Sequence, residues 1–158
     1  MFGIASVPWT YAFVAGGGLP LWPSFVAAAT YYAAGGGTAG LVRGSAGNLA
    51  GVAYAAVTLA LVESLGGGVV ALSLLVGAAM FIASLHPFVE GLSFAPAGFL
   101  GYATLFGVHA GGAVVAVGGL PGETLAAAAA MLVGAAIGFV TDRVARRLAP
   151  APASVGPG

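Results

Sequence analysis

The amino-acid sequence predicts an all-α membrane protein with about six transmembrane helices, and three observations support this prediction. Hydrophobic residues make up 60% of the 158-residue chain, charged residues make up only 5%, and the mean hydropathy is +1.08. A soluble domain of this size needs many more charged residues on its surface. The apolar stretches recur along the whole chain, and they lack the apolar–polar alternation of membrane-barrel strands. Lipid is therefore the expected solvent.

Six apolar stretches of about 20 residues, the length that a helix needs to cross the bilayer core, are the expected spans. They cover residues 2–19, 21–36, 47–65, 67–87, 96–118 and 124–142. Glycine, proline and polar residues separate them, and Thr124 is placed to cap the sixth helix. We therefore predict one transmembrane domain over residues 1–147 and a disordered tail over residues 148–158.

The four arginines of the chain predict its orientation. Arg43 lies in the loop expected between the second and third spans, and the other three arginines follow the sixth span, on the same side of the membrane. Glu63 and Glu123 lie in loops on the opposite side. Because basic loops are normally retained in the cytoplasm, we expect a multi-pass protein with both termini cytoplasmic.

The two halves of the chain resemble each other. Phe25 corresponds to Phe99 and Thr30 to Thr104, each pair lying 74 positions apart, and a glycine cluster follows in both halves. The expected repeat units run from about 2 to 65 and from about 67 to 142. A unit of three spans places its two copies in opposite orientations, so the sequence predicts a 3+3 inverted repeat, a common plan of transporters and channels.

A proline opens the matching segment of each half. Pro23 and Pro96 suit the first turn of a helix, because proline in mid-helix removes a backbone hydrogen bond. Two alternatives remain open at this point. The prolines begin broken helices inside the membrane, whose positive ends face a central path, or they begin helices at the membrane surface.

If a path lies between the repeats, eight residues are candidates to line it. They are Phe25, Thr30, Tyr31, Asn48, Phe99, Thr104, Phe106 and His109. Each has a structural alternative, since membrane threonines often bond their own backbone, aromatic side chains pack in cores, and Asn48 is placed to cap the third span. His109 is expected deep in a span, where it relays a proton or bonds a neighbouring carbonyl, whereas His86 is expected at the membrane surface.

Small residues dominate the predicted spans, and the chain has 28 glycines. The pairs with GxxxG spacing are Gly47 and Gly51, Gly107 and Gly111, and Gly134 and Gly138. Small residues at this spacing allow helix backbones to approach closely. We expect these glycines to form tight helix–helix contacts, within one protomer or between protomers.

Several classes of function are disfavoured by composition. The chain has no cysteine and no lysine, so it offers no thiolate metal site, no cysteine nucleophile and no basic face for nucleic acid. No acid is paired with a histidine and a serine at a catalytic spacing, and the glycine-rich runs lack the lysine of a phosphate loop. We therefore expect no enzyme, no cofactor and no metal.

Several motifs resemble those of a known family. They are Leu-Trp-Pro-Ser-Phe at 21–25, Thr-Tyr-Tyr-Ala at 30–33, Gly-Gly-Thr-Ala-Gly-Leu at 36–41, Gly-Val-Ala-Tyr-Ala at 51–55 and Leu-Ser-Phe-Ala-Pro-Ala-Gly-Phe-Leu-Gly at 92–101. Together they resemble domain-of-unknown-function family 1097, a bacterial inner-membrane family typified by YcdZ. The resemblance covers nearly the whole chain and implies a small multi-span protein of the inner membrane. It implies no function.

Three functional hypotheses follow. The first is a channel or facilitator for a small neutral or weakly ionised solute, such as urea, ammonia, a short amide or a short monocarboxylic acid, working as a homo-oligomer such as a trimer. The second is a proton-coupled secondary transporter that uses His109 as its titrating group. The third is a membrane partner or assembly subunit that transports nothing.

Overall fold

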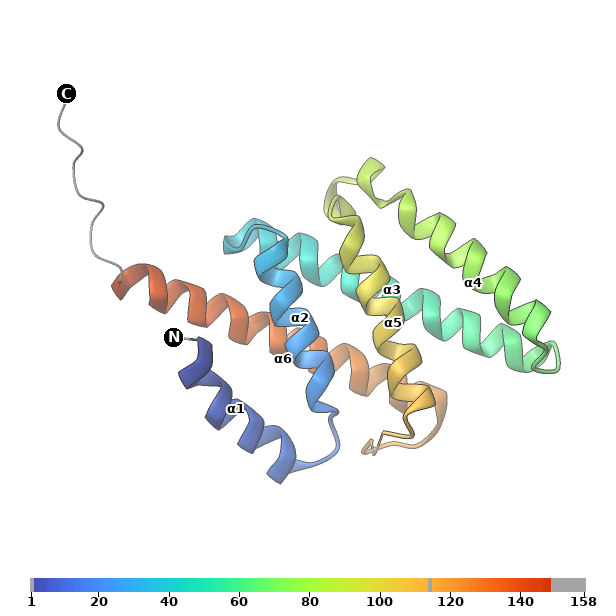
Figure 1. Cartoon of the computed structure of the whole chain (residues 1–158), viewed down its shortest axis with the longest axis horizontal. Helices are drawn as coiled ribbons and strands as arrows, with labels where there is room; N and C mark the ends of the chain where they lie inside the picture. The colour runs from blue at the N-terminus through green and yellow to red at the C-terminus, as the bar shows by residue number, and fades with distance from the viewer. Residues whose placement is uncertain (1, 114, 149–158) are drawn as a thin grey trace.

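The computed structural model describes residues 2–148 with the exception of residue 114, and this part of the chain forms helices and no strands (Figure 1). The α-helices are α1 (Phe2–Gly16), α2 (Leu21–Ala33), α3 (Gly37–Ser64), α4 (Val69–Ser84), α5 (Ala95–Ala110) and α6 (Gly119–Leu148). Two short 3-10 helices, η1 (His86–Phe88) and η2 (Glu90–Leu92), connect α4 to α5. The predicted all-α fold class is confirmed.

Three helical segments are long and apolar enough to cross a membrane: Gly37–Ser64, Val69–Phe88 and Gly119–Leu148. The other α-helices are shorter, and α2 has only 13 residues. At about 1.5 Å per residue, α2 is about 20 Å long, which is less than the roughly 30 Å of a bilayer core. Of the six predicted spans, the described residues therefore support three by length and composition, and the count of six is not confirmed.

Two helix boundaries differ from the prediction. Residues 37–46 were expected to form a polar loop around Arg43, but α3 begins at Gly37. The chain reverses within three residues, because Gly35, Gly36 and Gly37 all adopt positive φ values. The glycines that follow in the sequence are interior residues of α3 that face neighbouring helices, and Gly44 lies beside Thr30.

The last helix also begins earlier than predicted, at Gly119 instead of residue 124. Thr124 lies inside α6 and donates a hydrogen bond to the Leu120 carbonyl at 2.7 Å, so it does not cap the helix. At its other end, α6 continues through Leu148. The predicted tail lies outside the described residues from position 149 onward.

The helices pack in an exchanged pattern, in which the short helix of each half lies on the long helix of the other half. The most extensive contacts join α3 to α5 and α2 to α6, and the long helices α3 and α6 also contact each other. In Figure 1, α1 and α4 lie on opposite flanks of this central group. Large exposed apolar side chains of α1 and α4, such as Val7 and Phe81, suit a lipid environment.

Glycines allow the closest approach in both helix pairs. A Cβ atom at Gly134 of α6 would overlap the carbonyl oxygen of Ser24 in α2. A Cβ atom at Gly51 of α3 would overlap the carbonyl oxygen of Gly98 in α5. These contacts confirm that Gly51 and Gly134 pack helices tightly.

The prolines occupy the first turns of the two short helices, as predicted. Pro23 is the third residue of α2 and Pro96 is the second residue of α5. A helix does not use the N–H groups of its first turn for internal bonds, so proline costs little there. The core combines fully buried alanines, such as Ala27, Ala55 and Ala127, with larger side chains such as Leu105 and Met131.

Candidate functional site

The two threonines that the repeat pairs are buried and bonded to their own helices. Thr30 is fully buried and donates to the Val26 carbonyl at 2.8 Å. Thr104 is 1% exposed and donates to the Leu100 carbonyl at 2.7 Å. Their hydroxyl protons are therefore used within α2 and α5, which is the structural alternative for these residues.

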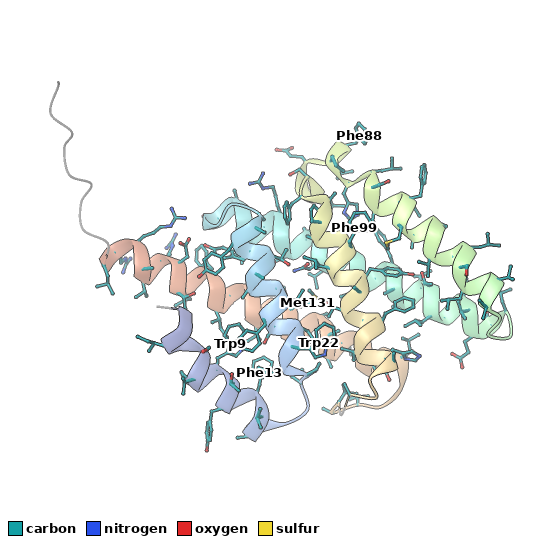
Figure 2. All side chains as sticks on the ribbon, in the orientation of Figure 1. Trp9, Phe13, Trp22, Phe88, Phe99 and Met131 are labelled. Carbon is teal, nitrogen blue, oxygen red and sulfur yellow. The ribbon has the colours of Figure 1, made fainter. Side chains whose placement is uncertain are left out.

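The candidate phenylalanines lie in three different environments. Phe25 stacks on Trp9 with ring centroids 4.3 Å apart, and Phe106 stacks on Tyr102 at 4.8 Å. Phe99 is 38% exposed on the surface of α5. Figure 2 shows Trp9 and Phe99 well apart, so Phe25 and Phe99 do not form one aromatic constriction in the protomer.

Tyr31 joins the end of α2 to the start of α3 and the end of α6. Its ring is 1% exposed, and its hydroxyl donates to Asp142 Oδ2 at 2.7 Å while accepting the Gly37 N–H at 2.7 Å. Arg146 Nε donates to the other oxygen of Asp142 at 2.9 Å. This group of residues ties three helix ends together, and the sequence analysis missed the role of Asp142 in it.

The two histidines differ in their burial within the protein. The side chain of His109 is 47% exposed at the end of α5, where its Nδ1 lies 2.7 Å from Glu123 Oε2. Both residues line an open cavity of about 410 Å³ together with Glu63. His109 was expected deep in a span over residues 96–118, but it lies in the last turn of α5, because the helix ends one residue later at Ala110.

His86 is the buried histidine, with only 2% of its surface exposed. The η1 turn carries its ring over the first turns of α5, where a Cβ atom at Gly98 would lie 2.7 Å from His86 Cε1. Nε2 of His86 lies 3.1 Å from the hydroxyl of Tyr54, and Nδ1 has no hydrogen-bond partner among the described residues. His86 lies in the connection between α4 and α5, and its ring is buried within the protein because the glycine at position 98 makes room for it.

Asn48 lies inside α3 rather than at its N-terminus, so it does not cap that helix. Its side chain is 1% exposed, and neither its amide nitrogen nor its amide oxygen has a hydrogen-bond partner within the described part of the chain. The backbone of Asn48 faces Gly101 of α5, where a Cβ atom would overlap its carbonyl oxygen. An unpaired buried polar group costs about 1–3 kcal/mol, so this position is unusual in a packed core.

Tyr54, Thr58, His86 and Tyr102 form what we call the α3–α5 polar cluster. Tyr102 faces Thr58, and Thr58 donates to the carbonyl of Tyr54 at 2.8 Å. A mostly apolar cavity of about 180 Å³ between α3 and α4 is lined in part by Tyr54 and Thr58. The cluster contains uncharged hydrogen-bonding groups and one histidine, and it adjoins a small cavity.

The larger cavities formed by the described residues lie elsewhere. One is on the outer face of α1 and another is between α3 and the start of α6. Thr30, Asn48 and Thr104 line neither of them. Among the described residues, no group of three or more histidine, aspartate and glutamate side chains is arranged to hold a metal ion.

The comparisons with known proteins agree with the motifs in the sequence. Residues 1–146 match the model of a family described as "Protein of unknown function (DUF1097)". No curated protein and no solved structure matches the chain. Since the match covers nearly the whole chain, the protein belongs to the DUF1097 family.

Proposed function

We propose that this protein is a membrane channel or facilitator for a small neutral or weakly ionised solute, such as urea, ammonia, a short amide or a short monocarboxylic acid. The observation that carries this proposal is the exchanged packing of the two halves, with α2 on α6 and α5 on α3. Such an arrangement is expected of an inverted repeat of three helices, and inverted repeats are the usual plan of transport proteins.

Positional equivalence supports the repeat beyond the segments that the sequence aligned. Gly51 and Gly134 lie 83 positions apart, and each faces a carbonyl of the short helix from the other half. Thr58 and Thr141 also lie 83 positions apart, and both donate to the carbonyl four residues earlier. The spacing is 74 between α2 and α5 and 83 between α3 and α6, because α5 is longer than α2 and the connection before α6 is longer than the one before α3.

The proposed topology has six membrane segments, with α2 and α5 as short segments that tilt or cross only part of the bilayer. The side chains of Arg43 and Arg146 both reach the α2–α3 turn, near Gly35 and Gly36 respectively. Basic residues gathered at one end support a cytoplasmic location for that end. On this proposal, both termini lie in the cytoplasm and the membrane is the bacterial inner membrane.

The location of the charges supports an uncharged solute. The described ion pairs, Asp142–Arg146 and His109–Glu123, lie toward helix ends. The buried polar residues are uncharged threonines, Ser24 and Asn48, together with His86. A path for a strongly charged ion normally needs rings of charge or ordered carbonyl sites, so neutral solutes fit this interior better.

The proposal is tested by stopped-flow light scattering on purified protein in sealed liposomes. The solutes are urea, acetamide, ammonia, formate, acetate and glycerol, and protein-free liposomes give the background rate. We expect accelerated flux of at least one neutral solute. Background rates for all of them, with inserted and folded protein, would contradict a facilitator and favour a membrane partner or assembly subunit.

A second candidate is proton-coupled transport, which the cavity around His109, Glu123 and Glu63 favours. Its weakness is the 47% exposure of the His109 side chain at a helix end. The test is solute uptake with and without an imposed pH gradient, in the wild type and in His109→Gln. Uptake that requires the gradient and is lost in the variant supports coupling, whereas equal uptake in both proteins excludes a coupling role for His109.

We also propose a homo-oligomer, such as a trimer, because small residues and apolar side chains are exposed on the outer helices. The mass of the protein in detergent, measured by light scattering with the detergent contribution subtracted, decides this point. A monomeric mass at all concentrations would contradict it.

A further inference from the structure

The side-chain carboxamide of Asn48 makes no hydrogen bond to any described residue. It offers two N–H donors and one carbonyl acceptor. It is 1% exposed, and neither of its polar atoms bonds to another described group. Buried polar groups in natural proteins nearly always have a partner, so the partner of Asn48 is expected to come from outside the chain.

The fold does not require a polar residue at this place. Asn48 lies three positions before Gly51, the glycine that contacts α5. In the other helix pair, Met131 lies three positions before Gly134, the glycine that contacts α2, and Met131 is 2% exposed. An apolar side chain therefore packs at the corresponding position of α6, and an apolar residue at position 48 would satisfy the same packing without an unpaired amide.

A second unpaired polar atom borders the same part of α5. The His86 ring lies against Gly98, and its Nδ1 is buried without a partner within the described chain. The backbone of Asn48 lies against Gly101, three residues and about one helical turn further along α5. The glycines at 98 and 101 allow the His86 ring and the backbone of Asn48 to lie directly against this turn of α5.

We propose that Asn48, with His86 as a second hydrogen-bonding group, binds a small uncharged amide or a urea at the α3–α5 interface. This inference rests on the proposed function and names the solute class and the residues that recognise it. An amide donates and accepts hydrogen bonds side by side, so it is complementary to the carboxamide of Asn48. Among the described residues, the side-chain hydrogen-bond partner of His86 is the uncharged Tyr54 and Asn48 has none, so no arginine is bonded to either group to balance the charge of a carboxylate.

The test is ligand-observed NMR with the purified full-length protein in detergent micelles. Acetamide is the probe, and acetate is its charged counterpart of similar size and shape. We expect saturation transfer to acetamide but not to acetate. In Asn48→Leu the affinity for acetamide should fall at least about tenfold, because the polar contacts of the carboxamide are lost.

Met131→Leu is the matched control, since it replaces the corresponding residue of the other interface, and it should bind acetamide as the wild type does. Thermal unfolding checks the fold of each variant. Asn48→Leu is expected to unfold at the wild-type temperature or above it, because it removes a buried unpaired amide. Asn48→Ala provides a smaller replacement at the same site if the leucine variant does not fold.

Several outcomes would overturn the inference. It fails if the wild type does not bind acetamide, if acetate binds equally well, or if the folded Asn48 variants retain wild-type affinity. A more stable Asn48→Leu protein with no acetamide binding in the wild type would show that Asn48 holds a structural water only. Liposome flux separates this result from the proposed function. Equal flux through the wild type and Asn48→Leu would contradict the binding site and leave the proposed facilitator standing. Acetamide binding without any flux would support the binding site and contradict the facilitator.

Discussion

The α2–α6 interface and the α3–α5 interface share one architecture. In each, a short helix with proline in its first turn lies on a long helix from the other half of the chain. In each, a glycine of the long helix faces a backbone carbonyl of the short one, Gly134 on Ser24 and Gly51 on Gly98. The contact geometry is therefore a common property of both halves.

Their polar chemistry differs. At the α2–α6 interface, the Tyr31 hydroxyl donates to Asp142 at 2.7 Å, and the Tyr32 hydroxyl donates to the Gly138 carbonyl at 3.2 Å. At the α3–α5 interface, the Asn48 carboxamide and His86 Nδ1 have no partner within the described residues. Among the described residues, no buried side-chain nitrogen or oxygen of α2 or α6 lacks a hydrogen bond, and these bonds stabilise the bundle. The α3–α5 interface contains unpaired polar groups, which lower the stability of the protein.

The largest expected effect comes from adding a methyl group at either glycine contact. Gly134→Ala and Gly51→Ala should each lower the free energy of unfolding by about 3 kcal/mol, because the new Cβ overlaps a carbonyl oxygen and separates the helices. Unfolding in mixed micelles measures this effect. Gly77→Ala in α4 is the control, since nothing lies within 4 Å of its Cβ position. A loss at only one of the two contacts would show that the interfaces are not equivalent.

The next effect comes from placing an unpaired amide in the bonded interface. Met131→Asn should lower the free energy of unfolding by about 2 kcal/mol, because Met131 is 2% exposed and a new amide there lacks partners. Met131→Leu serves as the apolar control and should change stability less. If Met131→Asn is as stable as the wild type, a buried unpaired amide does not lower the free energy of unfolding in this fold. The proposed difference in stability between the two interfaces would then be wrong.

A smaller effect is expected from removing one bonded hydroxyl. Tyr31→Phe should lower the free energy of unfolding by about 1 kcal/mol, because Asp142 and the Gly37 N–H each lose a hydrogen bond while Asp142 keeps its bond to Arg146. Tyr11→Phe is the matched control, since Tyr11 is 75% exposed. Equal stability of both variants would mean that this contact does not hold the three helix ends together.

The smallest effect is expected at His109. His109→Gln should change the free energy of unfolding by less than about 0.5 kcal/mol, because an ion pair with a half-exposed partner is screened by solvent. The same unfolding assay measures it, and the variant should keep wild-type solute flux if transport is passive. A large loss of stability would show that the His109–Glu123 contact joins α5 to α6 more firmly than its exposure indicates.

The family, the helical class, the first-turn prolines and the close packing at Gly51 and Gly134 were all predictable, because each depends on local residue types and spacings. The buried residues that matter most were harder to find. Asn48 was expected to line a path or to cap the third span, because it follows a predicted polar loop, and His86 was expected at the membrane surface because it lies in a loop before a proline. In both cases, contact with α5 determines how deeply the residue is buried, and this contact cannot be inferred from the spacing of residues in the sequence.

The sequence by itself determined that this chain is apolar and helical, because both properties follow from its composition and from the length of its apolar stretches. Only the tertiary structure decided which polar groups are paired. Position 48 carries an amide and position 131 a thioether. The contribution of each side chain to stability depends on which groups of the facing helix lie against it. Hydrogen bonding is directional and short-ranged, so the partner of a buried side chain is set by helix packing and not by its neighbours in the chain.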